Sequence, residues 1–303
     1  MDRLEAMGIL LKVVEQGSFS AASKILNIPL PTVSRKVSEL ETLLGVRLLH
    51  RTTRKLALTE LGVDYVKACK RIVEQVNDAE RELSGEYSEP KGELVITAPV
   101  MFGRLYILPI VTDFLSLYPS ININLTLNDR NNDLYNEDID LAVRLGSLPD
   151  SSLVATQVGT MRVVTCLSPK LLCQFGELTT PSDLNRFPCI ALNLAKPTPD
   201  WGYYDPKLAS YNSYHIDARL TVSDSEAAVT AAINDVGVTQ QLYYQVQQAL
   251  TDNLLKLVLE PYEPAPIPIN LVHKSRRYMP KKMRLFLDFA AQKLREELST
   301  KML

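Results

Sequence analysis

Histidine, cysteine and tryptophan are scarce in this sequence of 303 residues, with three, four and one copies. The cysteines show no Cys-x-x-Cys spacing, and with so few histidines they predict no zinc site or other metal site. They are Cys69, Cys166, Cys173 and Cys189. We expect four reduced thiols. Redox sensing through Cys166 and Cys173 is the alternative, although no neighbouring residue indicates a lowered thiol pKa.

Long apolar runs and catalytic motifs are also missing. No run of 18 apolar residues is present, which predicts no transmembrane helix, and residues 1–6 lack a basic region followed by an apolar one, so we expect no secretory signal and a cytoplasmic protein. The sequence has no Gly-x-Ser-x-Gly, no His-Glu-x-x-His and no phosphate-binding glycine loop. We therefore expect neither an enzyme nor a cofactor.

The sequence does contain enough apolar residues for a substantial core. Apolar residues make up 46% and charged residues 22%, with a net charge of −2. The length allows two or three domains.

Residues 18–41 predict two short helices joined by a tight turn. Ser18 or Ser20 can cap the first helix, Pro29 ends it, and Pro31 fits the first turn of the second. In the second helix the apolar residues recur at helical spacing and face inward; they are Val33, Val37, Leu40 and Leu44. The pattern indicates a helix-turn-helix, and an ordinary helical hairpin is the alternative.

A polar, cationic face remains on the outside of the second helix. Its members are Thr32, Ser34, Arg35, Lys36 and Ser38. Residues 47–59 then predict two short strands around a basic turn that holds Arg51, Arg54 and Lys55. From Pro31 to Lys55 there are six basic and two acidic residues, a net charge of +4 within an acidic chain. This charge indicates phosphate binding, and the hairpin indicates a wing.

These residues resemble the LysR-type transcriptional regulators over the whole length of the chain. The resemblance rests on residues 19–23, 31–37, 40–41, 44–49, 51–54 and 58–62, and further on residues 96–104 and 140–146. It implies a multidomain α+β fold. The parts are an N-terminal winged helix-turn-helix, a long linker helix, and a C-terminal α/β effector domain of two subdomains that resembles periplasmic binding proteins.

We expect three parts along the chain. Residues 1–59 form the DNA-binding domain, 60–92 a dimerisation helix and hinge, and 93–303 the effector domain. Subdomain I spans about 93–161 and 267–303, and subdomain II about 162–266. Alternating strands and helices from Glu93 onward predict parallel sheets. The aromatic-rich stretch from Pro197 to Tyr214 predicts an irregular insert. This insert either closes over a ligand or covers the core of subdomain II.

The linker helix, from about 60 to 83, carries a heptad pattern of apolar residues that predicts a self-paired coiled coil. The pattern consists of Tyr65, Cys69, Ile72, Val76, Ala79 and Leu83. Packing on its own chain is the alternative. A pair would place two recognition helices on successive major-groove half-sites.

Ligands of open α/β sheets bind beyond the carboxyl ends of the strands, which selects a set of effector-binding candidates. They are Thr97, Val100, Met101, Phe102, Asn128, Arg144, Asn193, Ser223, Ser225 and Thr239. The resemblance also implies that Thr97, Met101 and Phe102 lie near the effector pocket. Alternatively, Thr97, Ser223 and Ser225 are helix caps and Arg144 is a surface ion pair.

The prediction is therefore a LysR-type regulator of transcription whose promoter binding or assembly responds to a small-molecule effector. Its expected partners are duplex promoter DNA, the effector and further copies of the chain as a homodimer or homotetramer, with RNA polymerase as a further candidate and no membrane. An enzyme or solute-binding protein with a helical extension is the competing class. Gln240 and Gln241 stand where family members more often have an apolar run ending in proline. This departure and the aromatic-rich insert both argue against assigning a relative's ligand to this chain.

Overall fold

The computed structural model describes residues 2–51, 56–83, 89–129, 139–148, 152–192, 200–274 and 279–301, without the side chains at 51, 78–79, 81–83 and 300–301. The chain forms two compact units, Met1–Glu89 and Pro90–Leu303, which are described separately. Residues 84–88 of the expected hinge lie outside the described residues.

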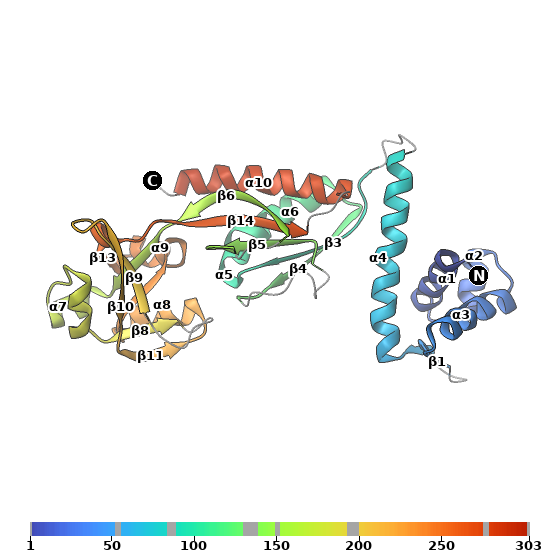
Figure 1. Ribbon diagram of the computed structural model, residues 1–303, viewed down its shortest axis with the longest axis horizontal. Coiled ribbons are helices and arrows are strands. Elements are labelled where there is room, and N and C mark those ends of the chain that lie inside the picture. Colours follow the sequence, from blue (N-terminus) through green and yellow to red (C-terminus); the bar gives the residue numbers. More distant parts are fainter. Residues whose placement is uncertain are drawn as a thin grey trace. The chain divides into compact units, whose positions relative to one another are not determined.

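The first unit is a three-helix head followed by a hairpin and a long helix (Figure 1). Its elements are α1 (Arg3–Glu15), α2 (Phe19–Leu26), α3 (Leu30–Leu44), β1 (Leu49–Arg51), β2 (Leu56–Leu58) and α4 (Glu60–Leu83). Ala6, Leu10, Val33 and Leu40 are fully buried at its centre. The predicted helix-turn-helix, winged hairpin and linker helix are all confirmed.

Local signals in the sequence explain the turn between α2 and α3. The Ser18 hydroxyl accepts the Ala21 N–H at 3.4 Å, which caps α2 as predicted. Asn27 ends α2 in the left-handed region, with φ of 54°; asparagine tolerates this conformation better than most residues. Pro31 lies in the first turn of α3, where its missing N–H costs nothing.

Two side chains fix the hairpin to the helices on either side of it. One Glu41 carboxylate oxygen accepts the backbone N–H groups of Leu48 and Leu49, at 2.9 and 3.1 Å. The Thr59 hydroxyl donates to the Arg47 carbonyl at 2.8 Å and accepts the Gly62 N–H at 2.9 Å. Thr59 therefore caps α4.

Replacing Gly62 with alanine should destabilise the first unit by about 1–3 kcal/mol, a typical cost of overpacking. A Cβ atom there would lie 2.0 Å from the Leu48 carbonyl oxygen, so backbone would have to move. Thermal unfolding of the full chain measures the effect. Gly8→Ala is the control, because a Cβ at Gly8 meets no atom within 4 Å. Equal melting temperatures for the two variants would contradict the close approach of α4 to the Leu48 carbonyl.

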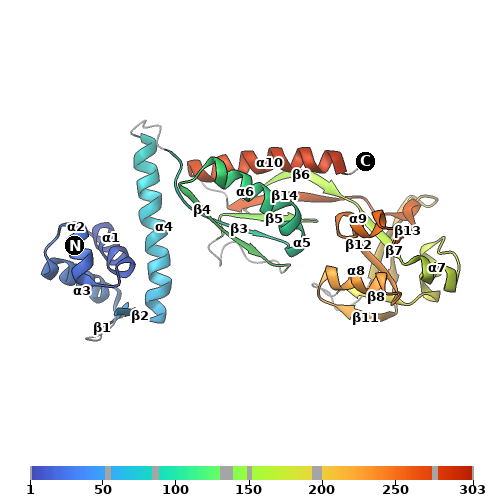
Figure 2. The ribbon, with the colours of Figure 1, turned by 180° about the vertical axis from the view of Figure 1, so that it is seen from behind.

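The second unit contains two five-stranded sheets (Figures 1 and 2). Subdomain I has the strand order β4-β3-β5-β14-β6. These strands are β3 (Gly92–Ala98), β4 (Ile121–Leu127), β5 (Leu141–Leu145), β6 (Leu153–Met161) and β14 (Ile267–Lys274). β3 pairs in parallel with β4 and β5, whereas β14 is antiparallel to β5 and β6.

The helices of subdomain I cover one face of its sheet. They are α5 (Val100–Phe102), the π-turn η1 (Gly103–Ile107), α6 (Leu108–Leu117) and α10 (Lys281–Lys301). Phe102, Phe114 and Phe286 are buried in the core beneath them. One described segment, Val100–Leu117, has the length and apolar composition of a membrane-spanning helix, with a mean hydropathy of 1.5. Its buried residues pack into this core, which accounts for much of that composition.

Subdomain II has the strand order β11-β8-β12-β7-β13. Its strands are β7 (Val163–Leu167), β8 (Cys189–Leu192), β11 (Ala218–Val222), β12 (Val238–Leu242) and β13 (Lys256–Val258). Its helices are α7 (Pro169–Phe175), α8 (Ser225–Ile233) and α9 (Tyr243–Thr251), with the short 3-10 turns η2 (Pro181–Arg186) and η3 (Glu260–Tyr262).

The aromatic-rich insert was wrongly expected to be irregular. It forms an antiparallel hairpin of β9 (Asp200–Asp205) and β10 (Ser210–His215). Trp201 and Tyr203 point inward and are buried, while Asp200 and Gly202 are exposed. Of the two roles left open for the insert, the structure supports covering the core of subdomain II. β10 ends at His215, and the next strand, β11 (Ala218–Val222), belongs to a different sheet.

Candidate nucleic-acid interface and effector site

Helix α3 turns its apolar residues inward and a polar face outward. Val33, Val37 and Leu40 are buried, whereas Arg35 is exposed over 64% of its side chain. At about 100° per residue, Arg35 lies nearly opposite Val33 on the helix. Arg35 Nη1 lies 3.2 Å from Glu39 Oε1 one turn later, so its guanidinium is oriented along the helix surface. Thr32, Ser34 and Ser38 are half-buried on the flanks of this face.

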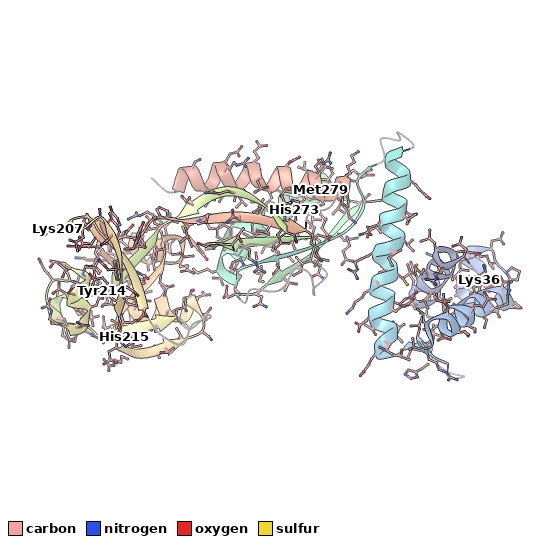
Figure 3. All side chains as sticks on the ribbon, in the orientation of Figure 1. Lys36, Lys207, Tyr214, His215, His273 and Met279 are labelled. Carbon is pink, nitrogen blue, oxygen red and sulfur yellow. The ribbon has the colours of Figure 1, made fainter. Side chains whose placement is uncertain are left out.

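Lys36 behaves differently from its neighbour Arg35. Its ammonium group donates to the Glu5 carboxylate of α1, and only 16% of its side chain is exposed (Lys36 is labelled in Figure 3). Lys36 projects from the side of α3 rather than from its outward face, which brings it against α1. It therefore contributes an ion pair between two helices of the head.

The basic turn of the wing lies outside the described residues. This applies to Arg54 and Lys55 and to the side chain of Arg51, whose backbone pairs with Leu56. Arg47, just before the hairpin, is exposed. The described cations of the head that face solvent near α3 thus include Arg35 and Arg47.

The apolar stripe of α4 divides into two parts. Cys69 is fully buried in the core of the head, and Tyr65 packs against the same core. Ile72 remains 41% exposed and Leu61 is 58% exposed, while Val76 is half-buried. The first seam positions thus contact the chain's own helices. The side chains of Ala79 and Leu83 lie outside the described residues.

The effector candidates of subdomain I lie at the carboxyl ends of β3, β4 and β5. Thr97 is 1% exposed and Arg144 9%. Val100, Met101 and Asn128 are half-buried, and Phe102 is a core residue that stacks on Tyr106 with ring centroids 4.7 Å apart. In subdomain II, Ser223 is exposed and Ser225 and Thr239 are buried. Asn193 lies outside the described residues.

The alternative that serines cap α8 is wrong. The residue that caps this helix is Asp224, whose carboxylate accepts the Ala227 N–H at 2.7 Å. Ser223 lies before this cap, and Ser225 after it.

Two buried polar atoms among the described residues have no hydrogen-bond partner: Thr97 Oγ1 and Gln241 Oε1. Gln241 is 3% exposed, and its amide nitrogen donates to Thr239 Oγ1 at 2.8 Å. Thr239 Oγ1 lies 3.5 Å from the Ile190 carbonyl oxygen. An unsatisfied buried polar group costs about 1–3 kcal/mol, so each atom is suited to a hydrogen bond with a bound molecule.

A carboxylate of the chain lies at the start of α5. Asp129 Oδ1 accepts the Val100 N–H at 2.9 Å. Burial raises the pKa of the Tyr244 phenol, and the negative charge of Asp129 adds to the shift. Sequence reasoning missed Asp129, although it lies only two residues after the end of β4.

Two sets of contacts join the two subdomains. Arg104 of η1 donates to both carboxylate oxygens of Glu226 in α8, at 3.2 Å. The Tyr244 ring meets Phe102 and Tyr106 edge-on, with centroids 5.5 and 5.9 Å apart. At the crossing between β6 and β7, Arg162 makes two hydrogen bonds to Glu263 within subdomain II, at 2.9 and 2.8 Å.

The thiols show no sign of activation. Cys69, Cys166 and Cys189 are buried and Cys173 is exposed, all without disulfides. Burial raises the pKa of the Cys166 and Cys189 thiols to about 12, so both are protonated at neutral pH. Among the described residues, no group of three or more His, Cys, Asp or Glu side chains is placed to hold a metal ion.

Each of the two units matches a known protein family. Residues 4–63 match the model of the bacterial regulatory helix-turn-helix proteins of the LysR family, and residues 88–295 match the LysR substrate-binding domain. An HTH-type transcriptional regulator of Xanthomonas campestris pv. campestris is 34% identical over 290 residues, covering 94% of this chain and 84% of that protein.

Two solved structures are similar over nearly the whole chain. The virulence activator AphB of Vibrio cholerae is 27% identical, with a TM-score of 0.60, covering 95% of this chain and 98% of AphB. The regulator CrgA of Neisseria meningitidis is 29% identical, with a TM-score of 0.61, covering 96% and 98%. The chain belongs to the LysR family of transcriptional regulators, with an N-terminal DNA-binding domain and a C-terminal effector-binding domain.

Proposed function

We propose that two copies of this chain bind successive major-groove half-sites of one promoter operator, each through the outward face of α3. The exposed guanidinium of Arg35 carries this proposal. Arg35, Ser34 and Thr32 contact base edges, and Ser38 lies at the margin of the same surface. Arg51, Arg54 and Lys55 of the wing, together with Arg47, contact phosphates. Lys36 is left out because Glu5 holds its ammonium group.

The test is an anisotropy titration of the full-length protein with duplexes selected from a random pool, repeated at several salt concentrations. Binding through several phosphates predicts that log Kd rises linearly with log salt, with a slope of about 0.9 for each phosphate neutralised. A Kd that does not depend on salt would contradict the phosphate contacts.

The copies pair through the exposed apolar face of α4 in a homodimer, or in a homotetramer built from such dimers. Leu61, Ile72 and Val76 supply this face, and Ala79 and Leu83 continue the predicted pattern. Cys69 and Tyr65 are not included, because they pack in the head. The same proposal includes the division into residues 1–59, 60–92 and 93–303, with subdomain boundaries near 161 and 267. It also includes a cytoplasmic location, the lack of catalysis and a contact with RNA polymerase.

The effector is a small molecule held between the two subdomains by the strand-end residues. Thr97 and Gln241 supply unsatisfied hydrogen-bonding atoms, and Asn128, Arg144, Asn193, Ser225 and Thr239 are further candidates, with Ser223, Val100 and Met101 at the margin. Phe102 supports the site from the core. Binding that favours one arrangement of the subdomains shifts the population of the paired assembly.

Thr97→Val separates stability from effector response. Valine has nearly the same shape as threonine but no hydroxyl, so the variant should be stabilised by about 1 kcal/mol because the unsatisfied group is removed. The same variant should respond less to effector in a promoter-reporter assay. Thermal unfolding and the reporter measure the two effects. A destabilised variant would show that the hydroxyl has a partner, and an unchanged reporter response would remove Thr97 from the site.

A further inference from the structure

The first turn of α3 exposes three consecutive apolar residues: Pro29, Leu30 and Pro31. Leu30 is 42% exposed although it begins the helix whose N-terminal residues contact base edges in proteins of this architecture. Leaving a leucine in water forgoes hydrophobic free energy that its burial would recover. Burial of Leu30 by a bound partner would therefore be favourable at this end of the helix.

Hydrogen bonding is nearly absent at this tip. Pro29 provides no side-chain cap for α3, and Pro31 has no N–H. The N–H groups of Thr32 and Val33 both donate to the Pro29 carbonyl, at 2.9 and 3.1 Å. Among positions 30–33, the Leu30 amide is the one that remains. A contact made by the side chains of Leu30 and Pro31 is therefore apolar.

The tip adjoins the polar reading surface. Leu30 and Ser34 are one turn apart on α3, as are Pro31 and Arg35, and residues at this spacing are neighbours on a helix surface. A major groove that receives Ser34 and Arg35 therefore also receives Leu30. The apolar group that a base pair presents in the major groove is the C5-methyl of thymine.

We propose that Leu30 reads a thymine methyl group in each operator half-site, next to the bases read by Ser34 and Arg35. This role rests on the proposed DNA binding through α3. Leu30 then fixes sequence preference at one base pair by apolar contact, without a hydrogen bond.

Single thymine-to-uracil substitutions test the contact, because uracil lacks only the methyl group. The duplex is first selected from a random pool by the full-length protein, and each thymine is then replaced in turn. At one thymine of a half-site, uracil should weaken binding of the unmodified protein about fourfold, the equivalent of one buried methyl group. Leu30→Ala should bind the thymine duplex more weakly and be insensitive to uracil at that position.

Leu43→Ala is the matched control. Leu43 is 49% exposed on the same helix, but it lies 13 positions later, about 20 Å along the axis. This variant should keep the full sensitivity to uracil. A second variant, Leu30→Gln, should select adenine where the unmodified protein selects thymine, because glutamine pairs with the adenine edge.

Several results would overturn the proposal. Uracil sensitivity that is equal in Leu30→Ala and the unmodified protein would assign the methyl contact to another side chain. No uracil-sensitive position, or an unchanged preference in Leu30→Gln, would remove the contact altogether. Unchanged DNA binding with lost promoter activity in Leu30→Ala would mark the tip as a protein-docking site. If the unmodified protein binds no duplex, the proposed function itself fails.

Discussion

Replacing Arg35 with alanine should weaken binding to the selected operator by about 1–3 kcal/mol relative to random-sequence DNA of the same length. The Arg35 side chain is 64% exposed on the outward face of α3. A guanidinium in this position can bond to both O6 and N7 of guanine, which alanine cannot do. Anisotropy titrations of both duplexes at one salt concentration measure the difference.

Lys36→Ala is the control for this prediction, because it removes the adjacent positive charge. Its ammonium group is held by Glu5, so we expect a lower melting temperature with an unchanged ratio of operator to random binding. If Arg35→Ala weakens both duplexes equally, Arg35 is a phosphate contact. If Lys36→Ala reduces the ratio as much as Arg35→Ala does, the assignment of the two residues is reversed.

Replacing Ile72 with glutamate should separate the paired chains and weaken operator binding about 10²-fold or more. Ile72 is 41% exposed on α4, so the substitution leaves the core of the head intact but places a charge in the proposed interface. Two linked heads gain roughly 10²–10⁴ in affinity over one, and that gain is lost in single chains. Light scattering gives the mass, and anisotropy gives the affinity.

Val63→Glu is the matched control on the same helix. Val63 is 39% exposed, and nine residues separate it from Ile72, which places the two on opposite faces at about 100° per residue. We expect Val63→Glu to keep the mass of the unmodified protein. An unchanged mass for Ile72→Glu would reject pairing through this face of α4.

Local patterns in the sequence predicted the first unit well. Ser18 and Pro31 marked helix starts that the structure confirms. The apolar period of α4 predicted a helix to Leu83, which is where it ends. The apolar spacing on α4 does not indicate which element packs on each residue. The same spacing results whether the helix packs on its own chain or on another chain. Cys69 therefore turned out to belong to the head's own core.

Long-range pairs were beyond sequence reasoning in the second unit. The expectation that ligands bind beyond the carboxyl ends of strands selected Thr97. It could not show that the Thr97 hydroxyl lacks a hydrogen-bond partner. It also missed Asp129 at the start of α5 and the bond from Arg162 to Glu263, 101 residues later. Such contacts depend on how subdomains assemble and leave no periodic signal in either segment.

The most direct test of the account is the number of chains on one operator. Sedimentation velocity of the full-length protein with a labelled operator duplex at low salt gives the mass of the complex. We predict two chains on each duplex, or four where two pairs assemble. A complex with a single chain, or no complex with any selected duplex, would contradict the proposal that paired α3 helices bind the DNA.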